Sequence, residues 1–79
     1  MSLRERLVEL IARRAHLAPA EVQDDTPLIS SGLLDSLVVV DLVRELERSA
    51  GVAVPPADVS AEHLDTLARI LAYVERARR

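Results

Sequence analysis

The chain has 79 residues, 49% of them hydrophobic and 29% charged, which suits one small domain and excludes a disordered tail. It contains no cysteine and only two histidines, which are far apart, so disulfides, thiolate chemistry and a clustered zinc site are excluded. The formal net charge is −3, and between positions 16 and 62 nine acidic residues outnumber two arginines. Such a stretch repels nucleic acid and attracts basic protein surfaces, unless it is simply solvated. We therefore expect no nucleic-acid partner.

No apolar run approaches the roughly 18 residues of a membrane span. The first residues also lack the apolar core of a signal peptide. These features predict a cytoplasmic, monomeric protein that forms a single domain over residues 1–79.

The first predicted helix runs from Leu3 to Ala15. Ser2 and Glu5 form a capping-box pattern, in which each side chain satisfies a free backbone N–H of the first turn. Apolar residues then recur on one helical face. They are Leu3, Leu7, Leu10 and Ile11.

Residues 16–34 are expected to form a long connection, because Pro19, Pro27 and Gly32 interrupt any helical pattern. A loop this long in a small domain tends to have a functional reason or some structure of its own. Its apolar residues are expected to pack on the core. They are Leu17, Val22, Leu28, Ile29 and Leu33.

The second predicted helix runs from Ser36 to about Ala50. Asp35 is a good N-cap, and Gly51 is a good left-handed stop. Leu34 and Val39 hold the positions of a hydrophobic staple. The residues predicted to face the core share one side of this helix. They are Val39, Leu42, Val43, Leu46 and Ala50.

The remaining residues predict one short helical turn at about 57–61, after Pro55 and Pro56, and a last helix that begins near Asp65 or Thr66. One face of this last helix is apolar and is expected to face the core. The helix ends in an arginine-rich tail, whose positive charge suits the negative C-terminal end of the helix dipole. The inward residues are Leu67, Ile70, Leu71 and Val74. The predicted fold class is therefore all-α: a small four-helix bundle of three main helices and one short helix, with a long loop between the first two.

Catalytic patterns are missing from the sequence. It has no glycine-rich phosphate loop and no defensible Ser/His/Asp arrangement, and the adjacent acids Asp24 and Asp25 suit a solvated loop. We expect a protein that is not an enzyme and that holds no metal.

The informative stretch is Gly32 to Leu37, which places the hydroxyl of Ser36 in the first turn of a helix, directly after the long loop. A phosphate esterified there would meet free backbone N–H groups and the positive end of the helix dipole. Taken alone, Asp-Ser-Leu is also compatible with an ordinary polar residue beside an N-cap.

The order of features along the whole chain resembles the acyl carrier protein family, which includes peptidyl and D-alanyl carrier proteins. The resemblance begins at the first helix and extends to the last. The matching segments are 24–28 (Asp-Asp-Thr-Pro-Leu), 32–37 (Gly-Leu-Leu-Asp-Ser-Leu), Leu42-Val43, 45–47 (Glu-Leu-Glu), Gly51-Val52 and Val54-Pro55.

The resemblance implies that Ser36 carries a covalent 4′-phosphopantetheine, attached by a phosphopantetheinyl transferase that uses coenzyme A. Asp35 would help the transferase recognise the site. The thiol of the group would hold an acyl or aminoacyl cargo as a thioester, which explains thiol chemistry in a chain without cysteine. Further expected partners are an acyl- or aminoacyl-activating ligase and downstream transferases.

The outer face of the second predicted helix suggests a docking surface. Leu37 and Val40 are apolar where a solvated helix would be polar, and Asp41, Glu45 and Glu47 lie nearby. Apolar contacts with acids around them suit brief docking to several proteins. The same surface supports an alternative, an unmodified helical adaptor that binds a partner through this helix.

Two positions depart from the pattern of fatty-acid carriers. Val38 stands where many of them have an acidic residue, and Arg44 stands where they usually have an apolar one. These departures make fatty-acid synthesis a poor fit. The form Leu33-Leu34-Asp35-Ser36 instead resembles stand-alone carriers that are served by an adenylating ligase, such as D-alanyl carriers.

Overall fold

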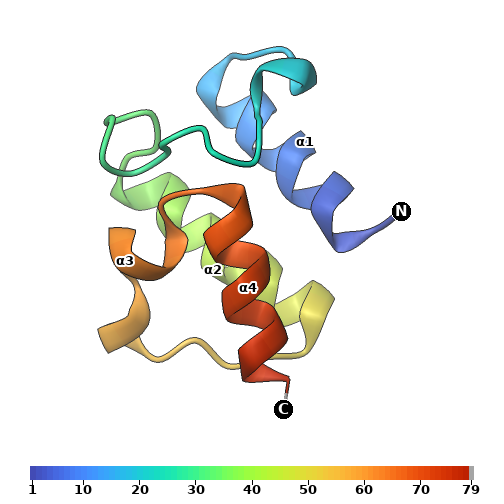
Figure 1. The fold of residues 1–79 in the computed structure, drawn as a ribbon, viewed down its shortest axis with the longest axis vertical. Helices are drawn as coiled ribbons and strands as arrows, with labels where there is room; N and C mark the ends of the chain where they lie inside the picture. The colour runs from blue at the N-terminus through green and yellow to red at the C-terminus, as the bar shows by residue number, and fades with distance from the viewer. Residues whose placement is uncertain (79) are drawn as a thin grey trace.

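The structure is a computed structural model that describes residues 1–78; Arg79, at the end of the predicted arginine-rich tail, lies outside the described residues. It contains four α-helices and two 3-10 turns (Figure 1). Their bounds are α1 Leu3–Ala15, η1 Pro19–Glu21, α2 Ser36–Ala50, η2 Pro56–Asp58, α3 Ala61–Leu64 and α4 Leu67–Ala77. Residues 1–78 form no strand, so the predicted all-α class is confirmed. None of their helices is long and apolar enough to cross a bilayer.

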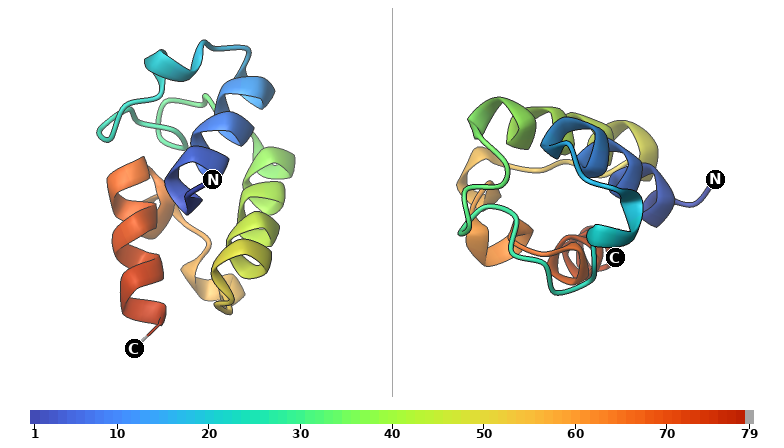
Figure 2. Two further views of the ribbon diagram at one scale, coloured as in Figure 1. Left: turned by 90° about the vertical axis from the view of Figure 1, so that its right-hand side faces the viewer. Right: turned by 90° about the horizontal axis from the view of Figure 1, so that it is seen from above.

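The helices surround one aliphatic core. α1 packs against both α2 and α4, and α3 packs against α4. Seen from above, α1 and α2 lie along one side of the molecule and α3 and α4 along the other (Figure 2). The first turn of α2 consequently lies close to α3 and to the loop that precedes α2 (Figure 1).

Local capping signals fix the ends of α1 and α2, whose predicted bounds are confirmed. Ser2 Oγ accepts the amide of Glu5 at 3.1 Å, and the Glu5 carboxylate accepts the amide of Ser2 at 3.1 Å, which completes the capping box. The bond from the Ser2 amide to the carboxylate is the main cause that lowers the pKa of Glu5. Asp35 caps α2, and Gly51 ends it at φ +68°. Both helices therefore begin and end where short-range hydrogen bonding dictates.

The core is mostly as predicted, with differences at its edges. Its fully buried side chains are Leu7, Ile11, Leu28, Leu42, Leu46, Leu64, Leu67 and Ile70. Several predicted core residues are only half-buried and pack on its margin; they are Leu3, Leu10, Val43, Ala50 and Leu71. Val38, outside the predicted stripe, is only 7% exposed. The buried face of α2 is thus wider than the predicted stripe.

The segment between α2 and α4 corrects the prediction of one turn at 57–61. Instead, η2 ends at Asp58, and α3 begins at Ala61. Ser60 separates the two because its backbone is extended, at φ −155° and ψ 166°. α4 begins at Leu67, and Thr66 caps it by accepting the amide of Arg69 at 3.1 Å. Of the two predicted caps, Asp65 has a different role, described below.

Candidate functional site

Ser36 is the first residue of α2, and its side chain is exposed. The Asp35 carboxylate accepts the amide of Val38 at 2.9 Å, and the Asp35 carbonyl accepts the amide of Val39 at 3.0 Å. The amides of Ser36 and Leu37 donate no hydrogen bond to any residue in the range 1–78. An exposed hydroxyl thus lies beside two unused N–H donors at a helix start, which is an arrangement that accommodates a phosphate.

A hollow of about 440 Å³ opens beside this serine. Its walls come from three parts of the chain: the loop before α2, the first turns of α2, and the segment between η2 and α3. The lining residues are Ile29, Leu34, Asp35, Ser36, Val39, Val40, Val59 and Ser60. Most of them are aliphatic, so a partly apolar chain attached to Ser36 can bury surface there.

Asp65 holds the loop side of this hollow in place. Its Oδ1 accepts the amides of Ile29 and Ser30, each at 2.8 Å, and its Oδ2 accepts the Ser30 hydroxyl at 2.8 Å. The Asp65 residue is only 8% exposed. The Ser30 amide is the main cause that lowers the pKa of this carboxyl, and burial opposes it. Asp65 is therefore an ionised side chain whose acceptors are used by the loop.

The outer face of α2 presents the two predicted apolar side chains. Leu37 is 73% exposed and Val40 is 45% exposed. Neither is in the core cluster, although Val40 also borders the hollow beside Ser36. This part of the predicted docking surface is available to a partner.

The acids predicted for the same surface are engaged within the chain. Asp41 forms an ion pair with Arg14 of α1. Glu47 accepts the amide of Val54 at 3.0 Å. Glu45 accepts hydrogen bonds from Ser49 and Arg48, and these bonds lower its pKa, with the Ser49 hydroxyl as the larger cause. The ion pairs of Asp41 and Glu45 with arginines thus make the net charge that α2 offers a partner smaller than a count of its acids indicates, whereas Glu47 keeps its charge.

The two departures from the fatty-acid carrier pattern have different environments. Val38 is buried, so an acidic side chain in its place would need a different local packing. Arg44 is exposed and forms no ion pair with residues 1–78. The outer face of α2 therefore combines two aliphatic side chains with a cation.

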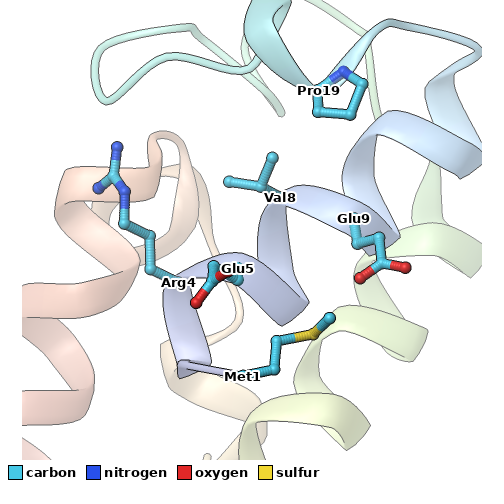
Figure 3. A pocket seen from close by; sticks show the side chains of 6 residues that line it. All are labelled: Met1, Arg4, Glu5, Val8, Glu9 and Pro19. Atoms are coloured by element: carbon cyan, nitrogen blue, oxygen red, sulfur yellow. The ribbon is translucent and has the colours of Figure 1, made fainter.

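A second hollow, of about 470 Å³, lies between α1 and η1, and it shares no lining residue with the one beside Ser36. Val8 of α1 points toward the turn that carries Pro19, and Met1, Arg4, Glu5 and Glu9 complete the lining (Figure 3). It contributes nothing to the site at α2.

Polar contacts elsewhere are structural. The Tyr73 hydroxyl donates to Asp58 at 2.7 Å, and the rings of Tyr73 and His63 lie 5.2 Å apart. Burial is the main cause that raises the pKa of Tyr73. Among residues 1–78, no group of three or more potential ligands is arranged to hold a metal ion.

Comparison with known proteins agrees with this geometry. A family model described as "Phosphopantetheine attachment site" matches residues 5–74. The chain belongs to this family. It is similar to an acyl carrier protein of Amoebophilus asiaticus, with 31% identity over 94% of this chain and 90% of the relative. It is also similar to a D-alanyl carrier protein of Streptococcus pyogenes serotype M5, with 33% identity over 95% of this chain and 94% of the relative. A D-alanyl carrier protein of Abiotrophia defectiva is 40% identical over 66% of each chain.

The predicted carrier role is confirmed by this membership, and the prosthetic group of the family is covalent 4′-phosphopantetheine. The start of α2 fits such a group, since it offers a hydroxyl, two unused amides and an apolar hollow. The alternative of an unmodified adaptor is not favoured.

Sequence reasoning missed the contact between Asp65 and Ser30. Two consecutive residues with capping side chains, Asp65 and Thr66, precede α4, and only one of them is needed there. This redundancy was the available signal for a second role of Asp65.

Proposed function

We propose that Ser36 is the attachment residue and that the chain presents an acyl or aminoacyl group, as a thioester, to partner enzymes. The observation that carries this proposal is the exposed Ser36 hydroxyl at the first position of α2, next to the unused amides of Ser36 and Leu37. The prosthetic group would supply the thiol. The protein would supply the anchoring oxygen, donors for the phosphate and an apolar surface for the attached chain.

A mass measurement tests the attachment residue. The purified apo chain is incubated with coenzyme A and a broad-specificity phosphopantetheinyl transferase, and its intact mass is recorded. We expect the mass of one phosphopantetheine to be added to the wild type and to Ser31→Ala, a control at another exposed serine, but not to Ser36→Ala. Ser36→Ala should keep its helical circular dichroism, because removing one exposed hydroxyl changes stability little. A mass gain that persists in Ser36→Ala would reject Ser36 as the attachment residue.

For the cargo, we propose an aminoacyl group, with D-alanine as the first candidate, loaded by an adenylating ligase. The support is the buried Val38 and the exposed Arg44, which depart from the fatty-acid carrier pattern, together with the similarity to a D-alanyl carrier of Streptococcus pyogenes. The holo chain is offered D-alanine with ATP and a D-alanine-activating ligase, and separately a fatty acid with ATP and an acyl-activating ligase. If the holo chain forms a thioester with the fatty acid but not with D-alanine, the proposal is contradicted.

The chain itself is proposed to be a non-catalytic, cytoplasmic carrier domain that depends on separate enzymes. Those enzymes are the transferase, the ligase and the acceptor enzymes that take up the cargo. The support is the exposed apolar pair Leu37 and Val40, which offers enzymes a surface beside the cargo.

A further inference from the structure

Asp65 lies at the junction of α3 and α4, far along the chain from the attachment site. The residues that its carboxylate contacts are 35 and 36 positions earlier in the sequence. The side chain uses both oxygens: Oδ1 accepts the two amides of Ile29 and Ser30, and Oδ2 accepts the Ser30 hydroxyl. It is the only charged residue among positions 1–78 that is buried. A carboxylate with this many partners fixes the loop to α3 rather than merely ending a helix.

A continuous path of backbone hydrogen bonds leads from Asp65 to the start of α2. The Asp65 carbonyl accepts the amide of Leu28 at 2.7 Å, and the Leu28 carbonyl accepts the amide of Leu34 at 2.9 Å. Leu34, which is 4% exposed, is directly followed by the N-cap Asp35 and then by Ser36. The position of Asp65 is thus transmitted to the Ser36 hydroxyl through two hydrogen bonds and two peptide units.

The same carboxylate joins the opposite walls of the hollow beside Ser36. Ile29 belongs to the loop wall, whereas Val59 and Ser60 belong to the wall that leads into α3. Asp65 ends α3 and holds the Ile29 amide, so it ties the two walls to each other. The second wall is anchored independently by the bond between Tyr73 and Asp58. Without the Asp65 carboxylate, the loop wall would keep only the backbone bond from the Leu28 amide to the Asp65 carbonyl, whereas the second wall would keep its own anchor.

We propose that Asp65 is a positioning residue for the phosphopantetheine attachment site. It sets the distance between the loop and α3, and through Leu28 and Leu34 it orients the first turn of α2, so that the Ser36 hydroxyl is presented in one geometry. This inference rests on the proposed role of Ser36. It adds a residue that touches neither the phosphate nor the cargo.

The experiment compares attachment kinetics in Asp65→Ala, Asp65→Asn and Ser30→Ala with coenzyme A and the broad-specificity transferase. Asp65→Ala removes every side-chain bond to the loop. Asparagine keeps a carbonyl oxygen for the two amides, and its NH₂ group can donate to Ser30 Oγ. We expect Asp65→Ala to lower kcat by about tenfold or more, since small displacements of a reacting group are costly. KM for the chain should change less than kcat, because Val40 and the rest of the outer face of α2 lie beyond its first turn.

Asp65→Asn should retain kcat within about twofold of wild type, and Ser30→Ala should lie between the two. Two controls separate positioning from stability. Asp25→Ala removes an exposed carboxylate from the same connection, and Val54→Ala weakens the core beyond the other end of α2. Both should keep the wild-type kcat at a temperature where each variant is folded by circular dichroism. If Asp65→Ala does not fold, the kcat values of Ser30→Ala and Asp65→Asn are compared with that of the wild type instead.

Amide hydrogen exchange supplies a second measurement. In Asp65→Ala the amides of Leu28, Ile29, Ser30 and Leu34 should exchange faster, while those of α1 should not. If these amides exchange faster in a variant and its kcat is unchanged, the positioning role is overturned. A change in KM without a change in kcat would also overturn it. No mass gain in the wild type would instead reject the proposed function, so the two failures are distinguishable.

Discussion

Arg14 of α1 forms an ion pair with Asp41 of α2, and the two side chains are 36% and 37% exposed. The pair connects the first two helices on the side of the predicted docking surface. Its charges are partly screened by solvent, so its contribution to stability is limited.

We expect the coupling between Arg14 and Asp41 to be below about 1 kcal/mol. The measurement is a double-mutant cycle of Arg14→Ala and Asp41→Ala, with unfolding by urea followed by circular dichroism. The coupling should shrink further as salt is added, because exposed charges are screened. A coupling that is large and insensitive to salt would contradict this prediction.

Leu37→Ala should weaken docking without weakening the fold. Its side chain is 73% exposed, so truncation should change the free energy of unfolding by no more than about 0.5 kcal/mol. If Leu37 contacts the transferase, KM for the chain should rise by about tenfold, the effect of losing one well-placed apolar contact. Gln23→Ala is the control, since Gln23 is exposed and uncharged and lies in the connection between α1 and α2. Equal KM values for the two variants would remove Leu37 from the docking surface.

Leu46→Ala should destabilise the domain severely. Leu46 is fully buried in the core on α2, and such truncations cost about 2–5 kcal/mol. A domain of this size has little stability to lose, so the melting temperature should fall strongly. Differential scanning calorimetry measures the change. An unaltered melting temperature would mean that the core is packed differently around α2.

Acid should weaken the contact between Asp65 and the loop. Folding lowers the pKa of Asp65, so this stabilisation is fully present above the unfolded value of about 4 and disappears as the pH falls through the folded value. Asp65→Asn should therefore be less stable than wild type near neutral pH, and the difference should shrink on acidification. Urea unfolding at several pH values tests this. A difference that stays constant down to about pH 2 would show that ionisation of Asp65 is irrelevant. Glu5 and Glu45 add to the acid sensitivity of both proteins in the same direction.

Gly51→Ala should cost about 1 kcal/mol, because Gly51 has φ +68° and L-residues are strained there. Apart from Gly51 itself and its two chain neighbours, no heavy atom lies within 4 Å of the position that a Cβ would take, so the cost comes from the backbone conformation and not from a clash with a distant residue. Gly51→Asn should cost less, since asparagine tolerates this region better. Thermal unfolding compares the two variants, and equal losses would point to a steric cause.

The sequence was sufficient to predict α1, α2 and the position of Ser36, because each depends on contacts between neighbours in the chain. The capping box at Ser2, the N-cap at Asp35 and the stop at Gly51 all act within a few residues. The capping of α4 by Thr66 was predictable for the same reason, although Asp65 fitted the local pattern equally well.

The remaining features depend on contacts between distant segments. The hydrogen bonds between Asp65 and the residues Ile29 and Ser30 join positions about half the chain apart, and no local sequence pattern predicts them. The burial of Val38 likewise depends on tertiary packing and does not follow from the periodicity of α2 alone. The pairing of Asp41 with Arg14 changed the expected charge of the docking surface for the same reason.

The connection between α1 and α2 contains two stretches that differ in how far their sequence and length can change. Residues 18–23 bond chiefly among themselves and to Thr26, and η1 packs on α1. Residues 28–34 close on themselves through the bond from Leu34 to Leu28 and are attached to Asp65. Apart from the buried Val22, a change in the first stretch should leave the approach to α2 intact, whereas one in the second should alter the entrance of the helix that bears Ser36. Evolution can therefore lengthen this connection at its beginning without disturbing the hydroxyl at its end.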